Sequence, residues 1–138
     1  MIIKFDTKIA VILRSDLPVW QQLNMTAFLV SGIAASVEEV VGENYEDASG
    51  NLYLPMFRQP VLVFGVDADQ IRGAYDRIMA QKVAASIFTE DLFATSHDEA
   101  NRAAVRAVPS EALKICGLAI RDNKKTVDLI VKGLALHA

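Results

Sequence analysis

The chain has 138 residues, of which 52% are hydrophobic and 22% charged, with a formal net charge of −3 at pH 7. This length predicts a single domain over residues 1–138, and the apolar composition excludes disorder and suggests that some apolar surface is buried against a partner subunit. The negative charge argues against nucleic-acid binding, which depends mainly on neutralising phosphates.

The first predicted elements are a strand and a long helix. The segment KIAVILR, residues 8–14, is typical of a central strand covered on both faces. Pro18 suits the first turn of a helix, with Asp16 as a cap upstream. A helical pattern then covers 23–41 and is apolar on most of its faces, which predicts burial in the core or between subunits. Gly32 within it is explained either by close approach of another backbone or by chance.

The rest of the chain alternates strands and helices, which predicts an α/β layered sheet. Two caps are visible: Asp67 or Asp69 for one helix, and Ser96 with Glu99 in a capping-box pattern for another. After a loop-rich connection over 42–60, the predicted strands cover 61–66, 85–89 and 112–120, and the predicted helices cover 67–82, 96–108 and 122–138.

Cysteine and histidine are too few for the common metal sites. The one cysteine, Cys116, excludes an intrachain disulfide and a multi-cysteine zinc site. It lies in LKICGLAI, which is typical of a buried strand, so we expect an inert core thiol. Of two histidines, His137 is the penultimate residue, so a histidine metal cluster is not expected. There is no P-loop and no G-x-G-x-x-G segment, and we expect no metal and no cofactor.

The same sequence predicts a cytoplasmic protein. The N-terminal segment MIIKFDTK lacks the basic region followed by an apolar region that marks a signal peptide. The most apolar segment, residues 25–37, is too short to span a bilayer. We therefore expect neither a membrane-spanning segment nor secretion.

Polar residues follow the first and third predicted strands, and they are the candidates for a site. Ligands of open α/β sheets gather beyond the carboxyl ends of strands, where helix N-termini also point. The candidate ligand-binding residues are Arg14, Asp16, Trp20, Gln21, Asn24 and Asn101, and the candidate catalytic residues are Asp91, Thr95 and His97.

Each candidate also has a plain structural interpretation. His97 is either a neutral hydrogen-bonding imidazole or a surface residue at a helix start. Trp20 is either a core residue or an apolar wall of a pocket in which Gln21, Gln22 and Asn24 supply oriented polar groups. Amide side chains both donate and accept hydrogen bonds, which suits recognition of an amide, a carboxylate or a base, but they are poor general bases. No G-x-S-x-G nucleophile segment is present.

The segment KIAVILRSDL followed by a helix resembles the opening of type 2 peptidyl-tRNA hydrolases, in which a strand ending in R-x-D-L leads into a helix. TEDLFAT is similar to that family's D-A-G-R-T loop, with Asp91 and Thr95 at the D-x-x-x-T spacing, and CGLAI and VDLIVKGLALH resemble its last strand and helix. The resemblance implies a three-layer fold, with a mixed four-stranded sheet and helices on both faces, and commonly a homodimer.

The differences fall on the catalytic groups. The hydrolase helix carries G-K-x-x-A-Q-x-x-H-A, and Leu23, Ala27 and Val30 stand at its lysine, glutamine and histidine positions. Ala94 stands where the loop arginine would be. The segment W-Q-x-L-N-x-x-A-F-L-x-S-G instead resembles the signature of an uncharacterised family thought to share the hydrolase fold. That resemblance covers the whole chain and implies no established activity.

Two functions stay open on the sequence, so whether the protein is an enzyme is undecided. The first is binding of a small polar ligand, or a role as a homodimer or higher homo-oligomer, with Trp20, Gln21 and Asn24 facing Asp91, Thr95 and His97. The second is hydrolysis of an ester or amide, on a peptidyl- or aminoacyl-tRNA substrate, with Asp91 and His97 as acid and base and Thr95 orienting water.

Overall fold

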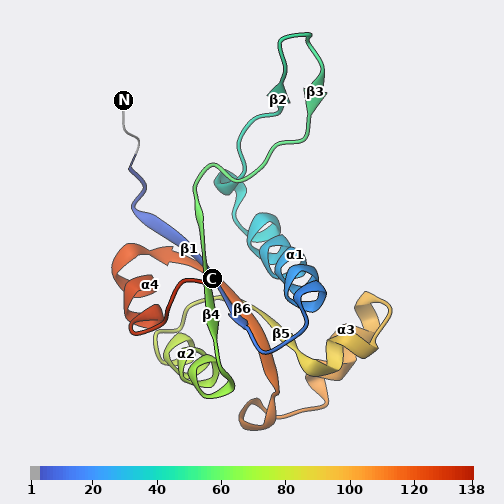
Figure 1. Cartoon of the computed structure of the whole chain (residues 1–138), viewed down its shortest axis with the longest axis vertical. Coiled ribbons are helices and arrows are strands. Elements are labelled where there is room, and N and C mark those ends of the chain that lie inside the picture. Colours follow the sequence, from blue (N-terminus) through green and yellow to red (C-terminus); the bar gives the residue numbers. More distant parts are fainter. Residues whose placement is uncertain (1–3) are drawn as a thin grey trace.

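A mixed four-stranded sheet forms the centre of the protein, which is represented by a computed structural model that describes residues 4–138 (Figure 1). The strand order is β4-β1-β6-β5, with β1 parallel to β4 and β6 antiparallel to both β1 and β5. The carboxyl ends of β1, β4 and β5 therefore meet at one edge of the sheet. The strands are β1 (Thr7–Arg14), β4 (Val61–Val66), β5 (Ala85–Thr89) and β6 (Ile115–Asn123).

Helices cover both faces of this sheet, which confirms the predicted α/β layering and the mixed sheet (Figure 1). One helix packs on one face and two pack on the other, each over its own apolar cluster. The fourth, α3, follows a short 3-10 helix, η2 (Glu90–Ala94), beside the first helix. The four helices are α1 (Val19–Ser36), α2 (Ala68–Ala80), α3 (Asp98–Arg106) and α4 (Lys124–Val131).

Strand β1 has the buried environment that its sequence predicts. Its central residues, from Ile9 to Leu13, are all buried, because sheet neighbours flank the strand and helices cover both of its faces. Cys116 on β6 is also fully buried, as predicted, and burial raises the pKa of its thiol to about 11.

Helix α1 starts earlier and ends earlier than predicted. Pro18 directly precedes its first residue, Val19, and supplies no side-chain cap. The prediction that Asp16 caps this helix is wrong, because the Asp16 carboxylate is held by Arg14 in a two-pronged ion pair. The helix ends at Ser36, and a separate 3-10 helix, η1 (Glu38–Val40), takes the place of its predicted last turn.

Helix α1 was expected to be buried in the core or between subunits, and within this chain the core buries only one of its stripes. That stripe is formed by Gln22, Met25, Leu29 and Ile33. Leu23 remains 67% exposed, although it is as apolar as its buried neighbours. A single helix lying on a sheet buries mainly the stripe that faces the sheet, and burial of the other faces between subunits stays a prediction.

Two predicted caps are settled by hydrogen bonds. Asp67 caps α2 in a complete capping box with Gln70, so Asp69 is not the cap. The prediction that Ser96 caps α3 is wrong: His97 is the N-cap, and its Nδ1 accepts a hydrogen bond from the Ala100 N–H at 3.2 Å.

The last helix is shorter than its predicted span of 122–138. It ends at Val131, and Gly133 then adopts a left-handed conformation with φ of 83° that reverses the chain. The following tail runs along β4, where Gly65 N–H donates to Ala135 O at 3.1 Å and His137 N–H donates to Val63 O at 2.8 Å. The tail thus covers part of the sheet edge.

The predicted loop 42–60 contains a hairpin that projects from the body of the protein (Figure 1). Its strands are β2 (Tyr45–Glu46) and β3 (Leu52–Tyr53), and we call residues 43–56 the arm. The base of the arm is fixed by a hydrogen bond from Gly42 N–H to Met56 O at 3.0 Å.

Candidate functional site

A cleft of about 430 Å³ lies where the first half of α1 meets η2 and the start of α3. Five of the candidate residues predicted from the sequence line it: Trp20, Asn24, Thr95, His97 and Asn101. The remaining lining residues are Phe28, Phe88, Leu92, Phe93, Ser96 and Asp98. We call this space the polar cleft.

One wall of the polar cleft is a chain of aromatic rings from three different elements. Phe93 on η2 contacts Trp20 on α1 edge-on, with ring centroids 6.2 Å apart, and contacts Phe88 on β5 at 4.9 Å. Phe28 on α1 follows, with its ring 6.0 Å from that of Phe88. Phe88 is buried, whereas Trp20 is 62% exposed, so the outer part of this wall is open to solvent.

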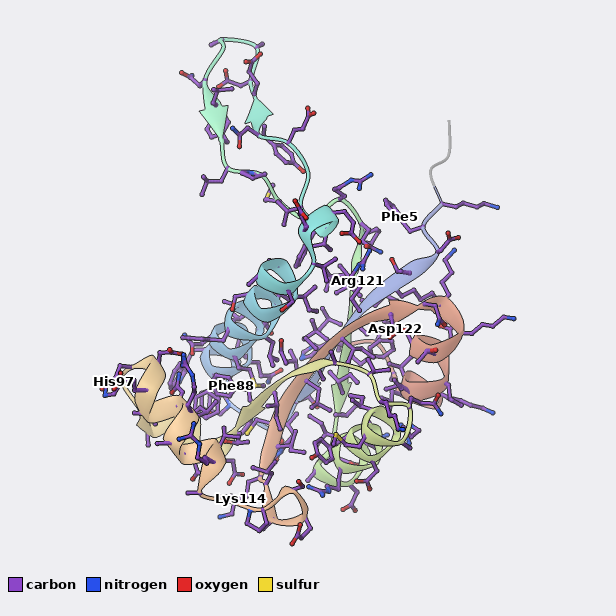
Figure 2. The ribbon with its side chains drawn as sticks, turned by 180° about the vertical axis from the view of Figure 1, so that it is seen from behind. Phe5, Phe88, His97, Lys114, Arg121 and Asp122 are labelled. Atoms are coloured by element: carbon purple, nitrogen blue, oxygen red, sulfur yellow. The ribbon has the colours of Figure 1, made fainter. Side chains whose placement is uncertain are left out.

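The opposite side of the polar cleft is formed by hydrogen-bonding groups at the start of α3. The hydroxyl of Thr95 is within hydrogen-bonding distance of Leu92 O and of the amide oxygen of Asn101. Since it has one hydrogen, it can donate to only one of them at a time. Because His97 Nδ1 accepts the Ala100 N–H, its neutral form carries the proton on Nε2 as a donor. Figure 2 shows His97 at the outer end of α3.

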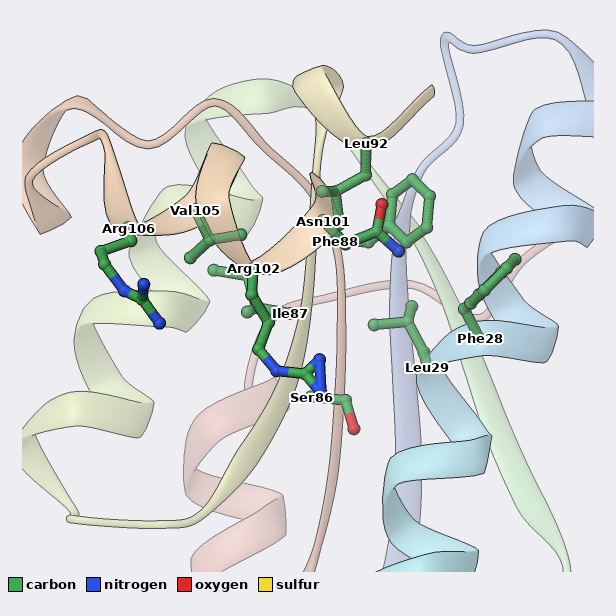
Figure 3. A pocket seen from close by; sticks show the side chains of 10 residues that line it. All are labelled: Phe28, Leu29, Ser86, Ile87, Phe88, Leu92, Asn101, Arg102, Val105 and Arg106. Carbon is green, nitrogen blue, oxygen red and sulfur yellow. The ribbon is translucent and has the colours of Figure 1, made fainter. Parts of the chain in front are cut away.

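A second cleft, of about 450 Å³, lies between α1, β5 and α3 and is mainly apolar (Figure 3). We call it the apolar cleft. Its apolar lining comes from Phe28 and Leu29 on α1, Ile87 and Phe88 on β5, Leu92 on η2 and Val105 on α3. Ser86, Asn101, Arg102 and Arg106 complete the lining, and the Arg102 guanidinium pairs with Asp98 one turn earlier on α3.

The two clefts share Phe28, Phe88, Leu92 and Asn101. They therefore form one continuous groove with a polar end at the N-terminus of α3 and an apolar end over β5. A groove of this size, mostly apolar and with a few converging polar groups, is typical of small-molecule sites.

Arg14 and Asp16 lie at the same sheet edge but are occupied by each other and by a third residue. Arg14 donates to both carboxylate oxygens of Asp16, at 3.1 and 2.8 Å, and to Glu90 at 2.8 Å. The pKa of Arg14 is raised, chiefly by its hydrogen bonds to Asp16, and the pKa of Asp16 is lowered by the same pair. This cluster ties the end of β1 to the start of η2 and leaves the Arg14 guanidinium already paired with two carboxylates.

Gln21 and Asp91 do not line either cleft. Gln21 is half-buried beside the groove residues of α1, and Asp91 lies exposed on the first turn of η2. Of the predicted catalytic residues, Thr95 and His97 share the polar cleft, whereas Asp91 lies outside its lining.

Gln22, expected from the sequence to supply a polar group to a pocket, lines neither cleft and is buried on the sheet-facing side of α1 instead. Its side-chain amide donates to Leu17 O at 2.7 Å and to Ser15 O at 3.3 Å, and its Oε1 lies 2.6 Å from His137 Nε2. These contacts join the strand-to-helix turn to the C-terminal tail. The spacing of Gln22 with Met25 and Leu29 places it on the buried face of a helix, and this spacing is the feature of the sequence that predicts its burial.

A metal-binding cluster and a membrane-spanning helix are both absent from the part of the chain that the structure describes. Residues 4–138 contain no group of three or more histidine, cysteine, aspartate or glutamate side chains placed to hold a metal ion. Over the same residues, no helix combines the length and apolar character needed to cross a membrane.

The sequence of residues 7–138 matches a family described as proteins of unknown function, DUF2000. The chain belongs to the DUF2000 family. A solved structure of Atu0240, a protein of unknown function from Agrobacterium tumefaciens strain C58, is similar to this DUF2000 protein, with 47% sequence identity and a TM-score of 0.95. The similarity covers 98% of this chain and 100% of that one, and no curated protein matches the sequence. The function of the groove therefore has to be argued from its chemistry.

Proposed function

We propose that this DUF2000 protein binds a small amphipathic molecule in the groove between α1 and α3. The observation that carries the proposal is that the polar and apolar clefts share a wall. A ligand in the groove would place its polar end near Asn24, Thr95 and His97 and its apolar body over Phe88 and the rest of the apolar lining.

The polar end of the groove favours groups that both donate and accept hydrogen bonds. The amides of Asn24 and Asn101 and the hydroxyl of Thr95 can do both, and Asp98 adds negative charge, partly balanced by Arg102. A phosphate would need positive charge that this end does not offer. A ligand with a hydroxyl, amide or carbonyl group fits better.

The exposed face of Trp20 supports binding rather than packing as its role. A tryptophan contributes most when its apolar ring is buried and its indole N–H finds a partner. Trp20 is 62% exposed in this ligand-free chain, so a ligand lying on it would bury apolar surface that folding leaves open.

We also propose that the arrangement corresponds to the type 2 peptidyl-tRNA hydrolase-like fold. The position of Arg14–Leu17, directly between the end of β1 and the start of α1, supports this. The hydrolase hypothesis itself has no further observation in its favour, because Asp91 lies outside the cleft that holds Thr95 and His97. Cytoplasmic location and homo-oligomer formation remain predictions.

The test uses the uncharged fluorescent probe 6-propionyl-2-(dimethylamino)naphthalene, which has an aromatic body and a carbonyl group. Val105 lines the apolar cleft, and Val105→Glu should weaken probe binding at least tenfold because it introduces a charge into an apolar wall. The matched control is Met79→Glu, at an exposed position on α2 on the opposite face of the sheet, and it should change binding less than twofold.

Equal effects of the two substitutions would contradict the groove as the binding site. Hydrolysis is tested separately, with a peptidyl-tRNA substrate and the Asp91→Asn variant. Cleavage that is lost in this variant would favour the hydrolase hypothesis over simple binding.

A further inference from the structure

Exposed apolar side chains gather on two surfaces outside the groove. The arm carries Tyr45, Leu52, Tyr53, Leu54 and Met56, all at least half exposed, and Leu54 is 83% exposed. The outer stripe of α1, at helical spacing, is formed by Val19, Leu23, Ala27 and Ala34, and Val19 is 71% exposed. We call this second surface the α1 stripe.

The arm is ordered by its own polar contacts rather than by packing. The Asp47 carboxylate accepts hydrogen bonds from the backbone N–H groups of Ser49 and Asn51, at 2.9 and 3.0 Å, and from the Tyr53 hydroxyl at 2.7 Å. These contacts shape the tip, while the apolar side chains of the hairpin contact nothing that would bury them. A two-stranded hairpin on its own is at best marginally stable in water, so an unpacked apolar arm indicates a missing partner surface.

We propose that the missing partner is a second copy of this chain, and that the arm of each copy packs on the α1 stripe of the other in a symmetric dimer. This inference does not depend on the ligand-binding proposal. It concerns a different stripe of α1 from the one formed by Trp20, Asn24 and Phe28, which lines the groove.

The distribution of charge favours packing of each arm on the partner's α1 helix over packing of the two arms on each other. Residues 43–56 contain Glu43, Glu46 and Asp47 and no lysine or arginine. Two arms in contact would therefore bring like charges together. Helix α1 has no charged residue in its 18 positions, so an arm lying on the α1 stripe meets no charge of its own sign there.

The apolar area is enough for a stable interface. The five large arm side chains, with Val19 and Leu23, are at least half exposed, and at roughly 100 Å² each they offer about 700 Å² per copy. A standard protein interface buries about 800 Å² per partner.

The position of the arm allows each copy to place its arm on the α1 helix of the other copy. The arm extends beyond the C-terminal end of α1 (Figure 1). If two α1 helices lie antiparallel with their C-terminal ends beside the two-fold axis, each arm lies along the α1 helix of the other copy. Leu52 of each arm then lies near Ala27 of the other copy.

The test measures the mass of the full chain in solution by sedimentation velocity, over a range of concentrations. The wild type should sediment as a dimer, and Leu54→Asp and Leu23→Asp should each raise the dissociation constant at least tenfold. The matched controls Met79→Asp and Leu129→Asp, at exposed apolar positions on α2 and α4, should remain dimers. A wild-type monomer, or a dimer that responds equally to all four substitutions, would overturn the proposal.

Disulfide trapping identifies which surfaces meet. Cys116 is fully buried, so a single new surface cysteine can be tested without removing it. Mixed Leu52→Cys and Ala27→Cys proteins should form a hetero-cross-linked dimer under mild oxidation. Leu52→Cys alone should cross-link poorly, and efficient self-cross-linking of this variant would show arm-to-arm contact and contradict the model of arm on helix.

Discussion

The indole ring of Trp20 meets the phenyl ring of Phe93 edge-on, with centroids 6.2 Å apart and an angle of 72° between the ring planes. The contact joins the first turn of α1 to η2 across the mouth of the polar cleft. Edge-to-face packing holds both rings in place but leaves one face of the exposed indole open. The wall of the groove is therefore set before any ligand arrives.

Substitutions of Trp20 and Phe88 should distinguish a residue available for ligand binding from a residue that packs in the core. Trp20→Ala should cost about 1 kcal/mol of unfolding free energy, because it removes one aromatic contact from a mostly exposed ring. Phe88→Ala should cost about 3–5 kcal/mol, because Phe88 is buried and the change leaves a cavity. Urea unfolding measures both values. If Trp20→Ala proved as destabilising as Phe88→Ala, Trp20 would be a core residue.

The buried amide of Gln22 should be important for stability. Gln22→Leu should cost about 1–3 kcal/mol, because it leaves the carbonyls of Ser15 and Leu17 and the ring of His137 without their partner. Amide hydrogen exchange at Gly65, which donates to the C-terminal tail, should also become faster. The neighbouring substitution Gln21→Leu should change stability by less than about 0.5 kcal/mol, and equal losses for the two would count against this role.

Gly32 faces the side chain of Ser86 on β5, and a methyl group added at Gly32 would overlap the Ser86 hydroxyl. Gly32→Ala alone should therefore gain less than the roughly 1 kcal/mol that alanine offers over glycine in a helix. Combining it with Ser86→Ala, which leaves only an ordinary contact to the Ser86 Cβ, should recover that gain. A double-mutant cycle by urea unfolding should give a coupling of about 1 kcal/mol. Simple additivity of the two changes would show that the close approach has no energetic effect.

The ion pair of Arg14 with Asp16 should make stability depend on acid pH. Arg14 lowers the pKa of Asp16 below its ordinary value of 3.8 in the folded chain. The resulting stabilisation is present above pH 3.8 and is lost as the pH falls through the lower, folded-state pKa. The stability difference between wild type and Asp16→Asn should therefore shrink as the pH is lowered from 7 to 2, in urea unfolding.

Arg14→Met supplies the control for this dependence, because without the guanidinium the Asp16 carboxylate loses its partner. In that background, Asp16→Asn should have little effect at any pH. A difference that persists unchanged at pH 2 in the wild-type background would be inconsistent with the ion pair as its source.

The strands and the alternation of strands with helices can be predicted from local sequence pattern. The apolar run of β1 is long and β-branched, and the Asp67 and Gln70 capping box marks the start of α2 within four residues of sequence. These features depend on neighbours in the chain, so a sequence reader can find them. The α/β layering was correctly expected for this reason, whereas the mixed four-stranded sheet was expected from the resemblance to type 2 peptidyl-tRNA hydrolases.

The groove and the C-terminal tail depend on distant contacts, and pattern alone could not place them. Gln22 and His137 are 115 positions apart, and nothing local indicates that the chain turns back after Gly133 to bring them together. The sequence of α1 is apolar on several faces, but it does not tell which face meets the sheet and which stays exposed. Trp20, Asn24, Thr95 and His97 lie together in the lining of the polar cleft, while their role in binding stays a proposal.

The most direct test of the proposed groove uses the indole N–H of Trp20, which gives a single resolved signal because the chain has one tryptophan. In ¹H–¹⁵N spectra, titration with the uncharged probe 6-propionyl-2-(dimethylamino)naphthalene should shift this signal together with the side-chain amides of Asn24 and Asn101. The arm signals of Tyr45 and Leu54 should move little. Saturable probe binding that shifts the arm but leaves the Trp20 indole signal in place would contradict the groove as the ligand site.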